Sequence, residues 1–148
     1  MVKCESIGMI QVAKVNPVLT KNTDVENYSF ITVDGDLYVV MNELTGDKAG
    51  ANGATIKAGE FLNGYLVKAW DAQKLVVDEE HIKYAENKSY ADIVAGTTLM
   101  GVDATSGKLE VISQAPTSGI YFKVTDKVSL CGKAVKVKVI VVDEAAAE

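Results

Sequence analysis

A regular alternation near the end of the chain constrains the fold most. In the stretch AVKVKVIVV, every second residue from 135 to 141 is valine, and Lys136, Lys138 and Ile140 stand between the valines. A period of two places successive side chains on opposite faces of an extended strand. The valines therefore face a core, the lysine-bearing face is partly wet, and the strand requires a sheet beside it.

A hairpin is predicted around Asp34-Gly35. Two runs rich in β-branched and aromatic residues, NYSFITV and DLYVVMN, flank this pair. Glycine accepts the positive φ that tight turns between antiparallel strands need. Upstream, Ser6 to Val15 predicts a first strand that stops at Asn16-Pro17. Residues 43–54 contain three glycines and predict a surface loop.

One phrase occurs twice in the middle of the chain. AGEFLNG at 58–64 and AGTTLMG at 95–101 share the pattern A-G-x-x-L-x-G. A strand that opens with Lys-Leu follows each copy, at Lys74 and at Lys108, and the two spacings differ by three residues. Coincidence is one explanation. We interpret the copies as two related β-hairpins, because the sequence downstream matches as well.

This interpretation gives the repeated residues equivalent places. The leading glycines, Gly59 and Gly96, are expected in turns of positive φ or little space. Leu62 and Leu99 are expected in the core. The closing glycines, expected where a strand bends or bulges, are Gly64 and Gly101.

Helical structure is predicted in a single region, residues 79–94, as one or two short helices. Asp78 can cap the first of them. Glu79 and Glu80 then lie in its first turn, where carboxylates oppose the positive end of the helix dipole.

These elements together predict a mainly β fold. We expect a small barrel or sandwich of antiparallel hairpins with one or two short helices. A single β-rich domain is expected over residues 1–142, with residues 1–16 as an N-terminal strand or arm. Residues 143–148 form an acidic C-terminal tail.

Composition excludes one large class of partner. All 15 basic residues are lysine, and the net charge is −5. Arginine supplies the bidentate fork that reads guanine and grips phosphate, so we expect no nucleic-acid partner.

No secretory signal or long apolar run is present, so we expect a protein made in a cytoplasm with no membrane partner. Cys4 and Cys131 allow a disulfide, although we favour reduced thiols.

Two single residues invite a functional interpretation. His81 stands beside Asp78, Glu79 and Glu80 and suggests a metal or acid–base site. We favour a surface residue at a solvated helix start, because zinc needs three or four ligands with a second shell. We therefore expect no catalytic residue, no metal, no cofactor and no enzymatic activity. Trp70 is either an interface anchor or a core residue, and the sequence leaves both open.

The second copy of the repeat carries a resemblance to a known family. Its residues 95–99, followed by Asp-Ala-Thr-Ser-Gly-Lys-Leu at 103–109, resemble the head decoration proteins of tailed phages, including the lambda type. Residues 58–62 and 68–71 are a looser copy. The resemblance covers about the central third of the chain. It implies a small, mostly β protein on the outside of the capsid, commonly a trimer.

On this resemblance we expect a structural virion protein that cements the assembled phage head. Its partners would be the major capsid protein and further copies of itself in a homotrimer. It would be made in the host bacterial cytoplasm and reside on the capsid exterior. A terminal strand can add to a neighbour's sheet edge, so we nominate Ile7, Met9 and Ile10 as interface residues. Trp70 is nominated with them, because tryptophan is enriched at interfaces.

Two alternatives remain open at this point. One is a tail- or fibre-associated module that binds a cell-surface glycan through exposed aromatics at Trp70 and Tyr65. The other is a small metal-dependent enzyme that uses His81 and its neighbouring carboxylates.

Overall fold

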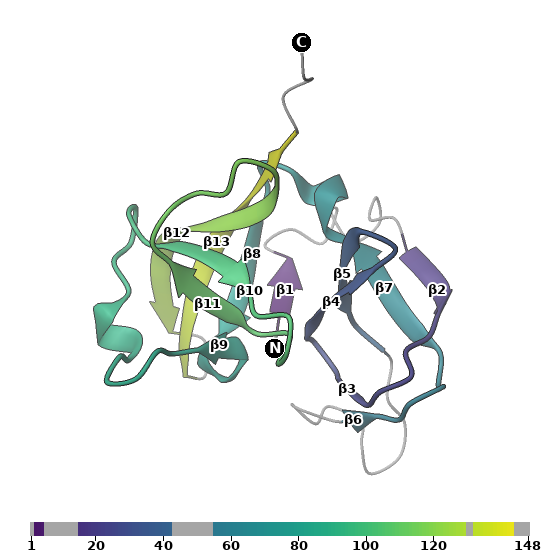
Figure 1. Cartoon of the computed structure of the whole chain (residues 1–148). Helices are drawn as coiled ribbons and strands as arrows, with labels where there is room; N and C mark the ends of the chain where they lie inside the picture. The colour runs from purple at the N-terminus through teal and green to yellow at the C-terminus, as the bar shows by residue number, and fades with distance from the viewer. Residues whose placement is uncertain (1, 5–14, 43–54, 130–131, 144–148) are drawn as a thin grey trace.

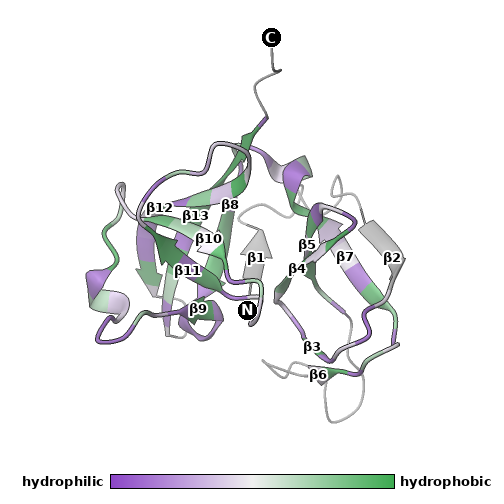
Figure 2. Cartoon of the chain, in the orientation of Figure 1, coloured by the Kyte–Doolittle hydropathy of each residue, from purple (hydrophilic) through white to green (hydrophobic). Residues whose placement is uncertain are grey.

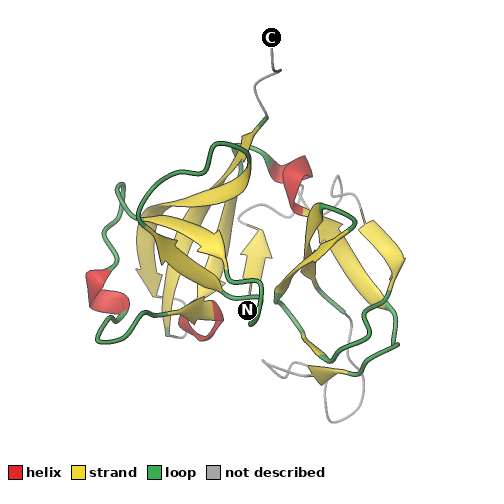
Figure 3. Ribbon diagram, viewed as in Figure 1, coloured by secondary structure: helices red, strands yellow, loops and turns green. Residues whose placement is uncertain are grey.

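The computed structural model describes residues 2–4, 15–42, 55–129 and 132–143, and these form a mainly β structure (Figures 1 and 3). The predicted fold class is confirmed: antiparallel sheets pack in a sandwich-like arrangement, and the described strands form no closed barrel. The predicted loop at 43–54, Cys131 and the tail beyond Asp143 lie outside the described residues.

The larger sheet has seven strands. In spatial order they are β1 (Val2–Cys4), β8 (Lys74–Asp78), β13 (Lys133–Val142), β12 (Gly119–Ser129), β10 (Leu99–Val102), β11 (Leu109–Ile112) and β9 (Ile82–Lys83). Neighbouring strands are antiparallel, except that β9 pairs with β11 in parallel.

The smaller sheet has four strands, and a two-stranded ribbon accompanies it. Their spatial order is β2 (Val15–Leu19), β7 (Leu62–Leu66), β5 (Asp36–Val40) and β4 (Phe30–Val33), with the ribbon formed by β3 (Val25–Glu26) and β6 (Thr55–Ile56). In Figure 1 the two sheets lie side by side, with β1 between them.

The hairpin predicted around Asp34-Gly35 is confirmed. It joins β4 to β5, and Val33 pairs with Asp36 across the turn. Asp34 has φ 51° and Gly35 has φ 84°, so both central residues are left-handed, as a primed hairpin turn requires.

The alternation along β13 is also confirmed. Val135, Val137 and Val139 are fully buried, whereas Lys136 and Lys138 are half-buried. Figure 2 shows this pattern as hydrophobic and hydrophilic bands along the strand.

The helical prediction was incomplete. Among the described residues the short 3₁₀ helices are η2 (Val67–Trp70), η3 (Glu79–His81) and η4 (Tyr90–Asp92), and η2 lies outside the predicted region. Asp78 makes no side-chain capping hydrogen bond at η3. Instead, Ser89 caps η4, and the Asp92 carboxylate accepts a hydrogen bond from the Ser89 amide at 2.9 Å. No helix in the described part of the chain is long and apolar enough to cross a membrane.

The two copies of the repeat begin alike. Gly59 and Gly96 have φ values of 85° and 83°, so both occupy the expected left-handed turns. Leu62 is buried, whereas Leu99 is only partly buried and its neighbour Met100 fills the core instead. The predicted equivalence of the two leucines is therefore wrong in detail.

The copies then diverge, which corrects the prediction of two related hairpins. The second copy is a hairpin, because β10 pairs with β11. The first copy is not: β7 belongs to the small sheet and β8 to the large one, with η2 between them. The three extra residues allow the connection to form η2, which places Val67 and Trp70 in the core. The β-sheet register shifts in β2 opposite Gly64, whereas no shift occurs at Gly101.

The predicted first strand lies mostly outside the described residues. Its predicted end at Asn16-Pro17 is wrong, because both residues belong to β2. β2 is an edge strand of the small sheet, and Pro17 lies where its register shifts between Asn16 and Leu19. An edge strand with a bulge tolerates proline, which has no amide hydrogen to donate.

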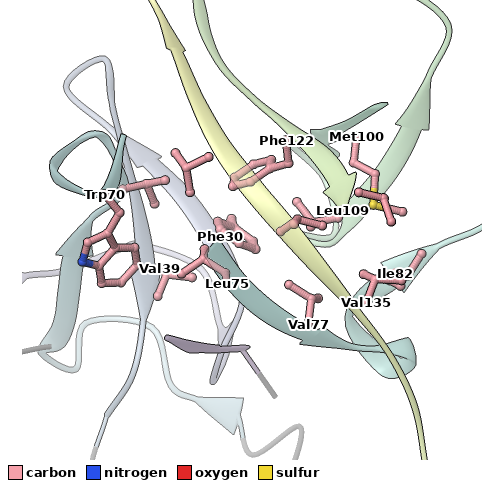
Figure 4. Packing of buried hydrophobic residues seen from close by; sticks show 14 of the residues in the cluster. Phe30, Val39, Trp70, Leu75, Val77, Ile82, Met100, Leu109, Phe122 and Val135 are labelled. Atoms are coloured by element: carbon pink, nitrogen blue, oxygen red, sulfur yellow. The ribbon is translucent and has the colours of Figure 1, made fainter. Parts of the chain in front are cut away.

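Both faces of the small sheet are buried. Phe30 and Val39 face the large core, which they share with β8, β10, β12 and β13 (Figure 4). Ile31, Val40 and Leu62 form a second cluster that β3 and β6 cover. Because the large core draws on both sheets, neither sheet buries its apolar face without the other.

The sheets meet at residues 27–30, which we call the junction segment. The Phe30 amide donates a hydrogen bond to the Gly107 carbonyl at 2.8 Å, and the Phe30 ring packs edge-on against Phe122. Gly107 has φ 70°, and a Cβ on it would lie 2.7 Å from the Phe30 oxygen. The turn between β10 and β11 can therefore reach the junction segment only with glycine at this position.

Gly107→Ala should lower the free energy of unfolding by more than the cost of placing a left-handed alanine in a turn. A left-handed alanine costs roughly 1–2 kcal/mol, and the clash with the Phe30 oxygen should raise the total loss to about 3 kcal/mol. Gly59→Ala is the matched control, since its φ is 85° and nothing lies within 4 Å of its Cβ position. Urea unfolding measures both, and equal losses would contradict the proposed close contact.

Candidate functional site

The nominated interface lies largely outside the described residues. Ile7, Met9 and Ile10 fall in the segment 5–14, so their contacts are not described. The strands on either side of this segment are described, and each lies at a sheet edge: β1 ends the large sheet and β2 ends the small one.

β1 is a short strand that pairs with one neighbour in the large sheet. Its three residues pair antiparallel with β8, Val2 opposite Val77 and Cys4 opposite Leu75. Three residue pairs are a short length of pairing for a strand. Sheet edges of this kind accept strands from other chains, because their backbone groups need partners.

Trp70 belongs to the core and is not available as a surface anchor. Its side chain is only 1% exposed, and its ring stacks on Tyr65 with the ring centres 6.2 Å apart. The indole Nε1 has no hydrogen-bond partner among the described residues. Of the two interpretations of Trp70, the core residue is the one that the structure bears out. A buried ring cannot stack on a sugar, which removes Trp70 from the glycan hypothesis.

His81 is buried as well, which corrects the expectation of a surface residue. It is 1% exposed at the end of η3, where the large sheet meets the junction segment. Its Nε2 lies 3.4 Å from the Asn27 carbonyl oxygen, so the tautomer protonated at Nε2 can donate a hydrogen bond there. The Tyr28 ring meets the imidazole edge-on. This burial is hard to predict from the sequence, because the two residues of η3 before His81 are the charged Glu79 and Glu80.

The surroundings of His81 favour its neutral form. Burial is the main cause that lowers the pKa of His81, and the positive charge of Lys108 lowers it further. The Asn27 carbonyl and the Glu26 carboxylate oppose the shift. Within residues 2–4, 15–42, 55–129 and 132–143, no group of three or more His, Cys, Asp or Glu side chains is placed to hold a metal ion.

Asparagine side chains hold the strand ends near this histidine. Asn27 is fully buried, and its amide group exchanges two hydrogen bonds with the backbone of Asn42, at 2.9 and 3.1 Å. The Asn42 amide in turn bonds to the backbone of Phe61 and Asn63. This network satisfies buried polar groups and fixes the junction segment against β5 and β7, so its role is structural.

Three surface hollows among the described residues are lined by neither His81 nor Trp70. One, of about 420 Å³, is mainly apolar and lies between Tyr84, Ile93 and Val111 beside β11. Another, of about 310 Å³, lies between residues 21–32 and the turn 102–107. Asp103 in that turn accepts hydrogen bonds from the Ser106 hydroxyl and amide, which with Lys83 lower the pKa of Asp103 to about 2. These contacts shape a turn and leave Asp103 a poor proton carrier.

Trp70 offers a direct optical check, because it is the single tryptophan of the chain. A fully buried indole should emit at shorter wavelength than free tryptophan, and iodide should quench it weakly. Exposed emission with strong quenching would contradict the burial. Trp70→Ala should cost about 3–5 kcal/mol in urea unfolding, as expected for a large core side chain.

His81 makes stability depend on pH in a defined window. The unfolded chain takes up a proton near pH 6.5, and the folded chain resists that proton, so stability should fall as the pH drops below about 6.5. His81→Gln should flatten this dependence in urea unfolding. Asp103, with its pKa of about 2, titrates far below this pH range. An unchanged pH profile in His81→Gln would contradict the neutral, buried state.

Comparison with known proteins identifies no relative of this chain. No protein-family model matches it, and neither a curated protein nor a solved structure does so.

Proposed function

We propose that this protein is a structural component of a phage particle that decorates the outer surface of the assembled head. The observation that carries the proposal is β1, a three-residue strand at the edge of the seven-stranded sheet. Such a strand can pair with an exposed sheet edge of a neighbouring subunit instead of with β8. The turn motifs at 95–99 and 103–109, which resemble those of phage head decoration proteins, support the same function.

The mechanism of cementing follows from repeated weak contacts. Each copy would pair only a short strand with the major capsid protein, which gives modest affinity. A homotrimer engages several capsid subunits at once, and its later contacts are effectively intramolecular. Binding to the assembled shell alone then stabilises the shell by mass action. The protein would be made in the bacterial cytoplasm and end on the capsid exterior.

Light scattering on the purified protein, with and without assembled capsid-like shells, tests this function. We expect stable shell binding, by a trimer or by a monomer that trimerises on the shell. Protein that remains unbound and monomeric in the presence of shells would end the proposal.

A variant set then tests the N-terminal strand. Deletion of residues 1–3 together with Ile7→Ser and Met9→Ser should weaken shell binding at least tenfold, because the pairing edge is lost. Val94→Ser is the control, since Val94 is an apolar side chain 55% exposed on another surface. Circular dichroism serves to check that each variant folds. Shell binding that survives the deletion would assign the contact to another face.

A further inference from the structure

Three lysines stand side by side across the large sheet, and we call them the lysine row. In the sheet register, Lys138 of β13 is directly opposite Lys74 of β8 on one side. It is directly opposite Lys123 of β12 on the other. Neighbouring strands lie about 4.8 Å apart, so the row places three ammonium-bearing side chains across roughly 10 Å. They occupy the outer face, because the next residues along, Leu75 and Val137, point into the core.

No carboxylate in the described part of the chain forms an ion pair with the lysine row. The described ion pairs use Lys57, Lys83 and Lys88 instead. Like charges directly opposite each other on neighbouring strands destabilise a sheet. The chain as a whole is acidic, with a net charge of −5, yet it gathers positive charge at this place. The arrangement costs stability in the isolated protein, which points to a partner that relieves the repulsion.

Apolar side chains border the row on the same face. Leu99 of β10 is opposite Lys123, and one step along the strands Tyr121 is opposite Ile140. All three of these side chains are half-buried. The row therefore lies next to apolar side chains that a partner could cover together with the charges.

We propose that this outer face, formed by β8, β13 and β12, binds an acidic protein surface that presents carboxylates next to apolar side chains. Three point charges over a short distance match a compact acidic patch. A long polyanion such as nucleic acid would extend past the row onto a surface of net negative charge, and the chain has no arginine with which to grip phosphate. The inference does not depend on the partner being a phage capsid.

Titration of ¹⁵N-labelled protein with a hexaglutamate peptide, followed by NMR, tests the proposal. Chemical-shift changes should concentrate on amides of β8, β12 and β13, and the affinity should fall as salt is raised. The triple variant Lys74→Gln, Lys123→Gln, Lys138→Gln should bind the peptide at least tenfold more weakly.

The control is a triple variant with the same change in charge. Lys57→Gln, Lys68→Gln and Lys88→Gln remove three exposed lysines outside this face, and binding should change less than twofold. Equal loss in both triple variants would show general attraction only and overturn the proposal. A hexanucleotide that binds the same face more tightly than hexaglutamate would overturn it in favour of nucleic acid.

Thermal unfolding tests the premise without any ligand. Lys138→Gln removes both cross-strand repulsions of the row, so the melting temperature should rise by about 1–3 °C at low salt. The rise should vanish at high salt, where the charges are screened. Lys68→Gln should leave the melting temperature unchanged. A Lys138→Gln variant that melts no higher than the parent protein would contradict the repulsion on which the inference rests.

Discussion

The approach of the β10–β11 turn to the junction segment is the contact on which the rest of the structure depends. The Gly107 carbonyl accepts a hydrogen bond from the Phe30 amide, and the two backbones come too close to admit a Cβ. This contact brings the Phe30 ring onto Phe122 and joins the apolar faces of the two sheets in one core. The two sheets thereby share one buried interior.

The features that could be predicted from sequence are those that local chemistry determines. A tight hairpin turn requires two left-handed residues, and the pair Asp34-Gly35 adopts that conformation readily, so the hairpin could be predicted. The valines of β13 alternate with lysines, and the buried face follows from the period of two. The left-handed turns at Gly59 and Gly96 could be predicted for the same reason, because residues within a few positions determine each backbone conformation.

The features that could not be predicted depend on contacts between distant segments. The passage from β7 to β8 between sheets looked like a hairpin, although Val67 and Trp70 stand at the i, i+3 spacing of a 3₁₀ turn and could have indicated η2. His81 lies in a charged stretch, and its burial follows from residues more than fifty positions earlier. The lysine row needs the register of three strands, and a period of two along one strand cannot supply that register.

The position of β8 in the large sheet governs the order in which the chain can fold. β8 lies between β1, near one end of the chain, and β13, near the other. Long stretches of sequence therefore separate β8 from both strands that pair with it, β1 and β13. Closing the loops formed by these stretches costs entropy before the contacts form. Such a sheet has a high contact order, and proteins of this kind fold slowly. During synthesis, β8 must wait with an unpaired edge until residues 133–142 become available.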